Sequence, residues 1–248
     1  MASETIAEVE DLHKSFDNHE ILKGISFQVL KGETLVIMGG SGSGKTVLLR
    51  HVAGLVRPDR GRVTVFGQRI DGLSEEELLP IRRRMGYVFQ GAALFDSISV
   101  FENVAYPLRE HTSLREREIR ERVLHFLSLV GLGEEVLPLL PSELSGGMRK
   151  RVGIARALAI EPEMLLFDEP TAGLDPTNSK MVAELILELR RGVCDTSIVV
   201  THDLELVKAI ADRLAVLIDG RFAALGPRDQ VLETDDAAVQ AFLAGEAR

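Results

Sequence analysis

Apolar residues in the first part of the chain occur in short runs that are typical of β-strands. Residues 20–30, 33–39 and 62–68 are each rich in β-branched or aromatic side chains and are bounded by glycine or charged residues. The run at 33–39 leads directly into a glycine-rich turn and then into an amphipathic stretch. The pattern therefore predicts strands up to about Gln68, one of which enters a turn that opens a helix.

The spacing of apolar residues changes in the middle of the chain. From about Ser97 to Glu161 they recur every three or four residues, most clearly in segments 100–111, 115–132 and 146–160, which predicts a helical lobe. Strand character returns at 164–170, 196–203 and 213–220, and helical stretches at 178–191 and 203–212 separate these strands. Strands that alternate with helices indicate an α/β fold with a parallel sheet.

Composition agrees with a folded chain and narrows its partners. The 248 residues are 45% apolar and 27% charged, which is ordinary for a globular protein. The formal net charge of -9 argues against a general nucleic-acid binder, and no stretch approaches the roughly 20 apolar residues that span a bilayer. The N-terminal residues resemble neither a secretory signal nor a transit peptide, so we expect a cytoplasmic location. Cys194 is the only cysteine, which excludes an internal disulfide and a multi-cysteine zinc site.

A phosphate-binding pattern occupies the turn after the strand at 33–39. It is G-x-x-x-x-G-K-[ST], formed by Gly39, Gly40, Ser41, Gly42, Ser43, Gly44, Lys45 and Thr46. The glycines let backbone amides surround phosphate oxygens, and the helix that follows directs the positive end of its dipole to the same anion. Lys45 suits the β- and γ-phosphates of ATP, and the Thr46 hydroxyl suits Mg²⁺. The loop alone indicates a nucleotide, so kinases and GTPases remain open.

Two adjacent acids end the buried-type strand that begins at Met164. Successive side chains of a strand point to opposite faces, so Asp168 and Glu169 are expected to differ in role. Asp168 is placed to hold Mg²⁺ through water, whereas Glu169 could orient or deprotonate the attacking water. Acids in such a place also serve as helix caps or solvated turns. Together with the phosphate loop, however, the pair predicts hydrolysis.

Further motifs resemble those of the ATP-binding subunits of ABC transporters. Residues 144–148, Leu-Ser-Gly-Gly-Met, resemble the LSGGQ signature of that family, and they precede a basic, apolar helical stretch. Other positions match in family order: Gln90 the glutamine that joins core and helical lobe, Gly173 to Asp175 the D-loop, His202 the switch histidine, and Phe16 the aromatic that stacks on adenine. The matches cover nearly the whole chain.

The resemblance implies a P-loop NTPase core with a parallel sheet, an N-terminal antiparallel β subdomain and an inserted α-helical lobe. It implies one domain over 1–248, with a core at 1–90 and 162–248 and a signature lobe at 91–161. It also implies ATP and Mg²⁺ as cofactors, with Mg²⁺ ligands at Thr46, Gln90 and Asp168. The implied catalytic residues are Glu169, His202 and Gln90.

Two copies are expected to share their ATP sites. In the family, the signature faces the ATP of the opposite subunit, and Ser145, Gly146, Gly147 and Met148 form it here, with Asp175 as the D-loop acid. The chain would thus form a homodimer on an integral membrane permease, peripheral to the cytoplasmic face of the inner membrane. The basic residues 149–151 beyond the signature are interpreted as a solvated face.

The aromatic residues around Gln90 bear on the partner. They are Tyr87, Phe89, Phe95, Phe101 and Tyr106. Core packing explains most of these residues, although the family uses this region to receive a helix of the permease. The sequence YPLREHT at 106–112 and Met148 resemble those of the MCE/Mla-type phospholipid and hydrophobic-compound transporters. This resemblance implies an MCE-domain component as a possible further partner. The alternatives are an importer ATPase for another solute, a non-transport ABC ATPase acting on nucleic acid, and a P-loop phosphotransferase. We expect no nucleic-acid partner.

Overall fold

A computed structural model describes residues 4–245 of the chain. The chain divides into two compact units, the first made of residues 1–82 and 195–248 and the second of residues 83–194. The predicted division of the chain at residues 91 and 161 stays a prediction. Within residues 4–245, no helix combines the length and apolarity that a membrane span requires.

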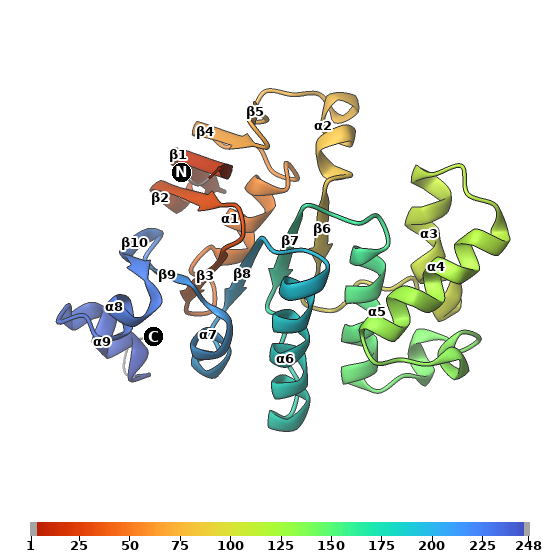
Figure 1. Ribbon diagram of the computed structural model, residues 1–248. Coiled ribbons are helices and arrows are strands. Elements are labelled where there is room, and N and C mark those ends of the chain that lie inside the picture. Colours follow the sequence, from red (N-terminus) through yellow and green to blue (C-terminus); the bar gives the residue numbers. More distant parts are fainter. Residues whose placement is uncertain (1–3, 246–248) are drawn as a thin grey trace. The chain divides into compact units, whose positions relative to one another are not determined.

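Two sheets form the first unit (Figure 1). One is antiparallel, with the order β2-β1-β4-β5: β1 (Thr5–Phe16), β2 (His19–Leu30), β4 (Arg60–Val65) and β5 (Gln68–Arg69). The other has the order β10-β9-β3-β8: β3 (Thr34–Gly39), β8 (Ser197–Thr201), β9 (Arg213–Ile218) and β10 (Arg221–Pro227). In it β3 runs parallel to both β8 and β9. All residues of β3 and β8 are buried, as expected for central strands of a parallel sheet.

The helices of this unit are short. They are α1 (Lys45–Val52), α2 (Glu75–Arg82), α7 (Leu204–Ile210), α8 (Arg228–Leu232) and α9 (Ala237–Leu243). Helix α1 follows β3 after a five-residue loop and packs on β3, β4 and β8 through buried Leu48, Leu49 and Val52. This packing fixes the direction in which the N-terminus of α1 points.

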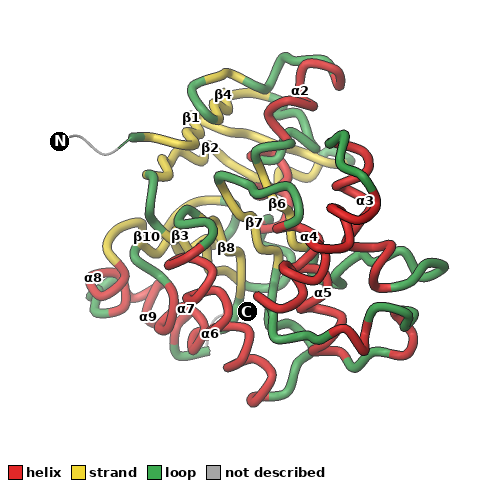
Figure 2. The backbone as a smooth tube through the Cα atoms, turned by 45° about the vertical axis from the view of Figure 1, so that its right-hand side comes forward, coloured by secondary structure: helices red, strands yellow, loops and turns green. Residues whose placement is uncertain are grey.

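The second unit combines a parallel strand pair with helices. Strands β6 (Met85–Val88) and β7 (Met164–Asp168) pair in register from Met85 with Met164 to Val88 with Phe167. The helices are α3 (Val100–His111), α4 (Glu116–Leu129), α5 (Gly146–Leu158) and α6 (Pro176–Gly192), with short 3-10 turns at 134–136 and 141–143. Figure 2 shows α3, α4 and α5 side by side, and each contacts the other two. Their shared core includes Val104, Phe126 and Val152.

The structure confirms the predicted α/β class. The strands expected within 20–30, 33–39, 62–68, 164–170, 196–203 and 213–220 are present, and the helix expected at 100–111 matches α3. The sequence pattern predicted neither the strands β1, β6 and β10 nor the helices α2, α8 and α9. In β1 the alternation of apolar residues is broken by register shifts and by Asp11, whose φ of 45° is left-handed. Strand β6 has only four residues, too few for a reliable period.

Candidate functional site

The loop between β3 and α1 has the conformation that its glycines permit. Gly42 and Gly44 have φ of 77° and 101°, a left-handed region that favours glycine. A side chain at Gly39 would lie 2.6 Å from Ser43 Oγ and 2.7 Å from the carbonyl oxygen of Leu217. These glycines therefore allow the backbone to turn sharply from the strand into the N-terminus of α1, where free amides and the helix dipole favour an anion.

Lys45 is the first residue of α1, and its side chain folds back over the loop. Its Nζ donates hydrogen bonds to the carbonyl oxygens of Gly39, at 2.7 Å, and Gly40, at 2.9 Å, and the residue is only 6% exposed. Within residues 4–245, Ser43 Oγ is buried without a hydrogen-bond partner. A lysine held over the loop and an unsatisfied hydroxyl in it fit a phosphate chain, which can supply acceptors to both.

A pocket of about 220 Å³ adjoins this loop. It is lined by residues 42–47 of the loop and α1, together with Phe16 and Ile21. Phe16 ends β1 and is 46% exposed, and the ammonium of Lys14 lies 5.2 Å from the centroid of its ring. An exposed aromatic face beside a phosphate loop can stack on a base, as the sequence predicts for adenine.

His202 follows the last residue of β8. Since β8 runs parallel to β3 and Thr201 lies opposite Met38, the carboxyl ends of the two strands meet at the same edge of the sheet. His202 is exposed, and Asp203 after it caps α7 by accepting hydrogen bonds from the amides of Glu205 and Leu206. The first unit thus holds Phe16, the phosphate loop and His202.

The second unit collects Gln90, Asp168 and Glu169. Strands β6 and β7 are parallel, so Gln90, two residues after β6, and Glu169, directly after β7, leave from the same edge. Asp168 and Glu169 are 3% and 7% exposed. The hydroxyl of Tyr87 donates a hydrogen bond to Asp168 Oδ2 at 3.2 Å. Two buried carboxylates at one strand end are suited to metal and water chemistry.

Lys150 contradicts the interpretation of residues 149–151 as a solvated face. Its side chain is 7% exposed, and Nζ donates to the backbone carbonyl oxygens of Gln90 and, at 3.2 Å, of Glu169. Burial lowers the pKa of Lys150, while the nearby Glu169 and Asp168 act in the opposite direction. Arg149 is exposed as expected, and Arg151 is half-buried against the carbonyl groups at the end of α4.

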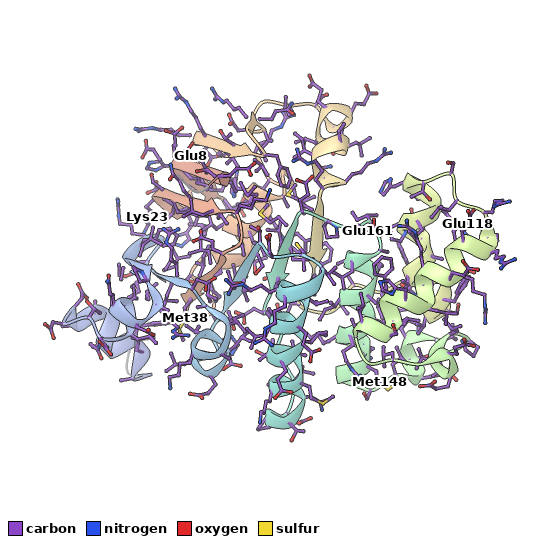
Figure 3. All side chains as sticks on the ribbon, in the orientation of Figure 1. Glu8, Lys23, Met38, Glu118, Met148 and Glu161 are labelled. Atoms are coloured by element: carbon purple, nitrogen blue, oxygen red, sulfur yellow. The ribbon has the colours of Figure 1, made fainter. Side chains whose placement is uncertain are left out.

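The signature residues begin helix α5. Ser145 is its N-cap and accepts a hydrogen bond from the amide of Met148 at 3.2 Å. Ser145 and Gly146 are exposed, which leaves the first amides of α5 accessible. Gly147 is buried, and a side chain there would meet Asn178 of α6 at 2.6 Å. Figure 3 labels Met148 in the first turn of α5 and Glu161 three residues beyond the last residue of that helix.

Asp175 has a structural task at the start of α6. Its carboxylate caps the helix, accepting from the amides of Thr177 and Asn178 at 3.0 and 3.1 Å and from the Asn178 side chain at 2.5 Å. These hydrogen bonds, first of all that of the Asn178 side chain, lower the pKa of Asp175. These contacts fix the orientation of the Asp175 carboxylate at the start of α6.

The aromatic residues around Gln90 only partly form a core. Tyr87, Phe89, Phe95 and Tyr106 line a pocket of about 330 Å³ whose other walls include Pro107 and Arg156. The rings of Phe95 and Tyr106 lie 5.1 Å apart and are 45% and 47% exposed. Phe101 does not line this pocket and stacks instead against the guanidinium of Arg109. An open apolar pocket of this kind is typical of a protein contact site.

Sequence reasoning missed Lys150 and the hydroxyl of Tyr87. A signal for Lys150 existed: it lies three residues after Gly147 and four before Ile154, on the buried face of α5. The neighbouring arginines point elsewhere on the helix. No signal in the sequence pairs Tyr87 with Asp168, because the contact depends on how β6 and β7 align.

Known proteins resemble this chain over most of its length. The model of the ABC transporter family matches residues 22–172. The intermembrane phospholipid transport system ATP-binding protein MlaF of Haemophilus influenzae is 43% identical over 99% of this chain and 92% of its own length. The MlaF protein of Escherichia coli K12 is 40% identical over 98% and 90%. The probable ribonucleotide transport ATP-binding protein mkl of Mycobacterium leprae is 40% identical over 96% of this chain, which spans 68% of that relative.

Solved structures agree with the sequence relatives. A dimeric ATP-binding cassette in a post-hydrolysis state, bound to ADP and Pi, superposes with a TM-score of 0.84 at 32% identity, over 90% of this chain and 99% of that one. The cbiO1 protein of Clostridium perfringens, part of an ABC transporter complex, gives 0.83 at 33% identity, over 96% and 95%. This chain therefore belongs to the ABC transporter family, as one of its ATP-binding and ATP-hydrolysing subunits.

Proposed function

We propose that this subunit drives an integral membrane permease that moves phospholipid or another hydrophobic compound across a bacterial envelope. The observation that carries the proposal is the match to MlaF, which pairs 99% of this chain with 92% of the relative at 43% identity. The match to the ribonucleotide transport protein covers only 68% of that relative. A permease for another solute is the second candidate, favoured by that name. The subunit would work at the cytoplasmic face of the inner membrane, with an MCE-domain component as a possible further partner.

The first unit supplies the nucleotide contacts in this proposal. The loop from Gly39 to Thr46 holds the phosphates, Lys45 transfers its hydrogen bonds from the loop carbonyls to the β- and γ-phosphates, and Phe16 stacks on adenine. The unsatisfied hydroxyl of Ser43 supports a ligand in the loop. Thr46, Gln90 and Asp168 would hold Mg²⁺, which supplies charge neutralisation at the phosphates when bound.

The second unit supplies the group that activates water. Glu169 is a buried carboxylate at a strand end, and we assign to it the orientation and deprotonation of the attacking water. His202 would contact the γ-phosphate through its ring, and Gln90 would respond to it through water or Mg²⁺. The hydrogen bond from Tyr87 keeps Asp168 in one orientation, which supports its role as a metal ligand.

Two copies of the chain would complete each ATP site. We assign Ser145, Gly146, Gly147 and Met148 to the ATP of the opposite copy, because the exposed start of α5 offers a hydroxyl and amides to an anion. Asp175 would hold the D-loop next to that contact. The superposed cassette is itself a dimer with ADP and Pi, which supports this arrangement.

The open aromatic pocket would receive a helix of the permease. Phe95 and Tyr106 present half-exposed rings there, and a short apolar helix can bury both. Coupling between two binding sites is reciprocal, so occupation of this pocket should change the affinity for ATP.

Replacing Glu169 by glutamine tests the ATPase proposal. The amide has nearly the same shape but cannot accept a proton, so we expect kcat to fall about 10²-fold or more while the dissociation constant for ATP stays within about twofold. Phosphate release and equilibrium binding of a fluorescent ATP analogue measure the two quantities. Glu188→Gln, an exposed change on α6, is the control and should leave both unchanged. Full turnover in Glu169→Gln would remove Glu169 from the proposed role.

Substrate stimulation tests the cargo. The chain is purified from membranes with its permease, and ATP turnover is measured with added phospholipid or with ribonucleotides. We expect phospholipid to raise turnover severalfold and ribonucleotides to leave it unchanged, since only a permease that binds the compound changes the cycle. Stimulation by ribonucleotides alone would favour the second candidate.

A further inference from the structure

Helix α5 holds the backbone of the segment after β6 at three successive points. Lys150 donates a hydrogen bond to the carbonyl oxygen of Gln90. Arg156 donates to the carbonyl oxygens of Ala92 and Ala93, both at 2.8 Å. Between them lies Gly153, where a side chain would approach Ala92 Cβ to 3.0 Å. One face of α5 is therefore fitted to residues 90–93.

The backbone that α5 holds is in an uncommon conformation. Ala92 and Ala93 have φ of 62° and 48°, and Glu169 has φ of 49°. Residues with a side chain occupy this left-handed region only where their surroundings impose it, and such positions concentrate at functional sites. Lys150 donates to the carbonyl oxygen of Glu169 itself, at 3.2 Å, and to that of Gln90, two residues before Ala92.

The burial of an ammonium group needs an explanation. A charged amine removed from water is costly unless hydrogen bonds and nearby negative charge compensate. Here the two backbone acceptors belong to Gln90 and Glu169, and the carboxylates of Asp168 and Glu169 act on the same amine. Its hydrogen bonds thus run to two of the residues proposed to act in hydrolysis, within one unit.

We propose that Lys150 is a positioning residue for ATP hydrolysis, which sets the backbone of Gln90 and Glu169 relative to the signature helix. The proposal rests on the catalytic role proposed for Glu169. Lys150 lies five residues after Ser145 on the same helix, so a shift of α5 on contact with the ATP of a second copy would move the carbonyl contacts of Gln90 and Glu169 together. Lys150 would then make hydrolysis sensitive to closure of the dimer.

Lys150→Met tests this role, since methionine keeps an unbranched side chain without hydrogen-bond donors. In the full-length chain we expect kcat to fall about 10- to 100-fold, because a misplacement near 1 Å has effects of that size, while KM and the dissociation constant for ATP stay within about twofold. Hydrogen exchange should accelerate in residues 89–94 and 168–172 more than elsewhere. Lys180→Met is the matched control, because Lys180 is the only other lysine of residues 83–194 and is exposed.

Lys150→Arg provides the rescue, because arginine keeps the charge and several donors. It should recover most of the turnover lost in Lys150→Met, and it carries the test if the methionine variant does not fold. Wild-type turnover and exchange in Lys150→Met would overturn the proposal, as would equal losses in ATP affinity and kcat. Glu169→Gln is measured in parallel: unchanged turnover there counts against the proposed function, whereas a strong loss there with no loss in Lys150→Met counts only against this inference.

Discussion

Two buried lysines mark the difference between the two units. Lys45 in the first unit and Lys150 in the second are 6% and 7% exposed, and both donate hydrogen bonds to backbone carbonyls. The acceptors differ. Lys45 bonds Gly39 and Gly40 of its own loop and lines a pocket, whereas Lys150 bonds Gln90 and Glu169, which are distant in the sequence.

This difference indicates that Lys45 is suited to bind a ligand, whereas Lys150 is suited to hold segments of the chain in place. The hydrogen bonds of Lys45 stay within residues 39–45 beside an open pocket, so its ammonium can turn to a phosphate without separating segments that are distant in the chain. The bonds of Lys150 join three segments, so any loss disturbs all of them. We propose that the first unit acts mainly in nucleotide binding, although His202 also lies there, and that the second acts mainly in turnover. Substitutions of the two lysines should separate these quantities.

The largest effect is expected at the start of α5. Ser145→Arg places a long cation where the signature would meet the ATP of a second copy, so we expect cooperative hydrolysis to fall more than about 10²-fold. ATP binding by the single chain should persist, because the first unit is unchanged. Phosphate release across protein concentration, together with equilibrium ATP binding, measures both. Binding lost together with turnover would break the assignment of the two roles to two units.

Loss of the helix cap needs its own control. Ser145 caps α5, and removal of such a cap costs about 1 kcal/mol. Ser99 caps α3 in the same unit through the amide of Glu102, so Ser99→Ala removes a comparable cap without touching the signature. If Ser99→Ala reduced turnover as strongly as Ser145→Arg, the effect would belong to helix stability.

A smaller effect is expected at Lys45, and it concerns the affinity for ATP rather than turnover. Lys45→Met removes charge-assisted hydrogen bonds to phosphate worth about 1.5–3 kcal/mol, so ATP should bind about 10- to 100-fold more weakly. Titration with a fluorescent ATP analogue measures this, and AMP serves as the control ligand because it lacks the β- and γ-phosphates. In Lys150→Met the same titration should remain near that of the wild type. Equal affinity losses in both variants would erase the contrast between the lysines.

The sequence predicts the first of these lysines and not the second. Lys45 is part of a motif whose residues are adjacent in the chain, so the pattern alone carries the geometry of the loop. The same holds for the strand that ends at Asp168 and for the helix that begins after Ser145. The α/β class follows in the same way, because each strand and helix carries its own period.

Lys150 depends on contacts between distant segments. Its partners lie 60 and 19 residues away in the chain, and hydrophobic periodicity does not report which carbonyl a buried amine reaches. Its position on the buried face of α5 is a signal, but the adjacent Arg149 and Arg151 obscure it. Strand β1 was missed for a related reason, since Asp11 and the register shifts interrupt its alternation.

The smallest expected effect concerns acid stability and lies in the first unit. His51 of α1 is buried; its Nδ1 donates to the carbonyl oxygen of Val47 at 2.7 Å, and Nε2 has no hydrogen-bond partner within residues 4–245. Burial lowers the pKa of His51, with a smaller contribution from Lys14. Since the unfolded chain then binds the proton more readily, stability from this group is present above pH 6.5 and is lost as the pH falls below it.

We therefore expect the free energy of unfolding to decrease below pH 6.5 by at most about 1.4 kcal/mol per pH unit from this residue. Denaturant unfolding of His51→Leu between pH 7 and 5 should show a shallower decrease than the wild type. His13→Gln gives the opposite control, because Glu20, and to a smaller extent Asp11, raise the pKa of His13, so its contribution is present at low pH and lost as the pH rises. The free energy of unfolding of His13→Gln should therefore decrease more steeply than that of the wild type as the pH falls. Parallel curves for His51→Leu and the wild type would show that burial and the charge of Lys14 do not hold His51 neutral in the folded chain.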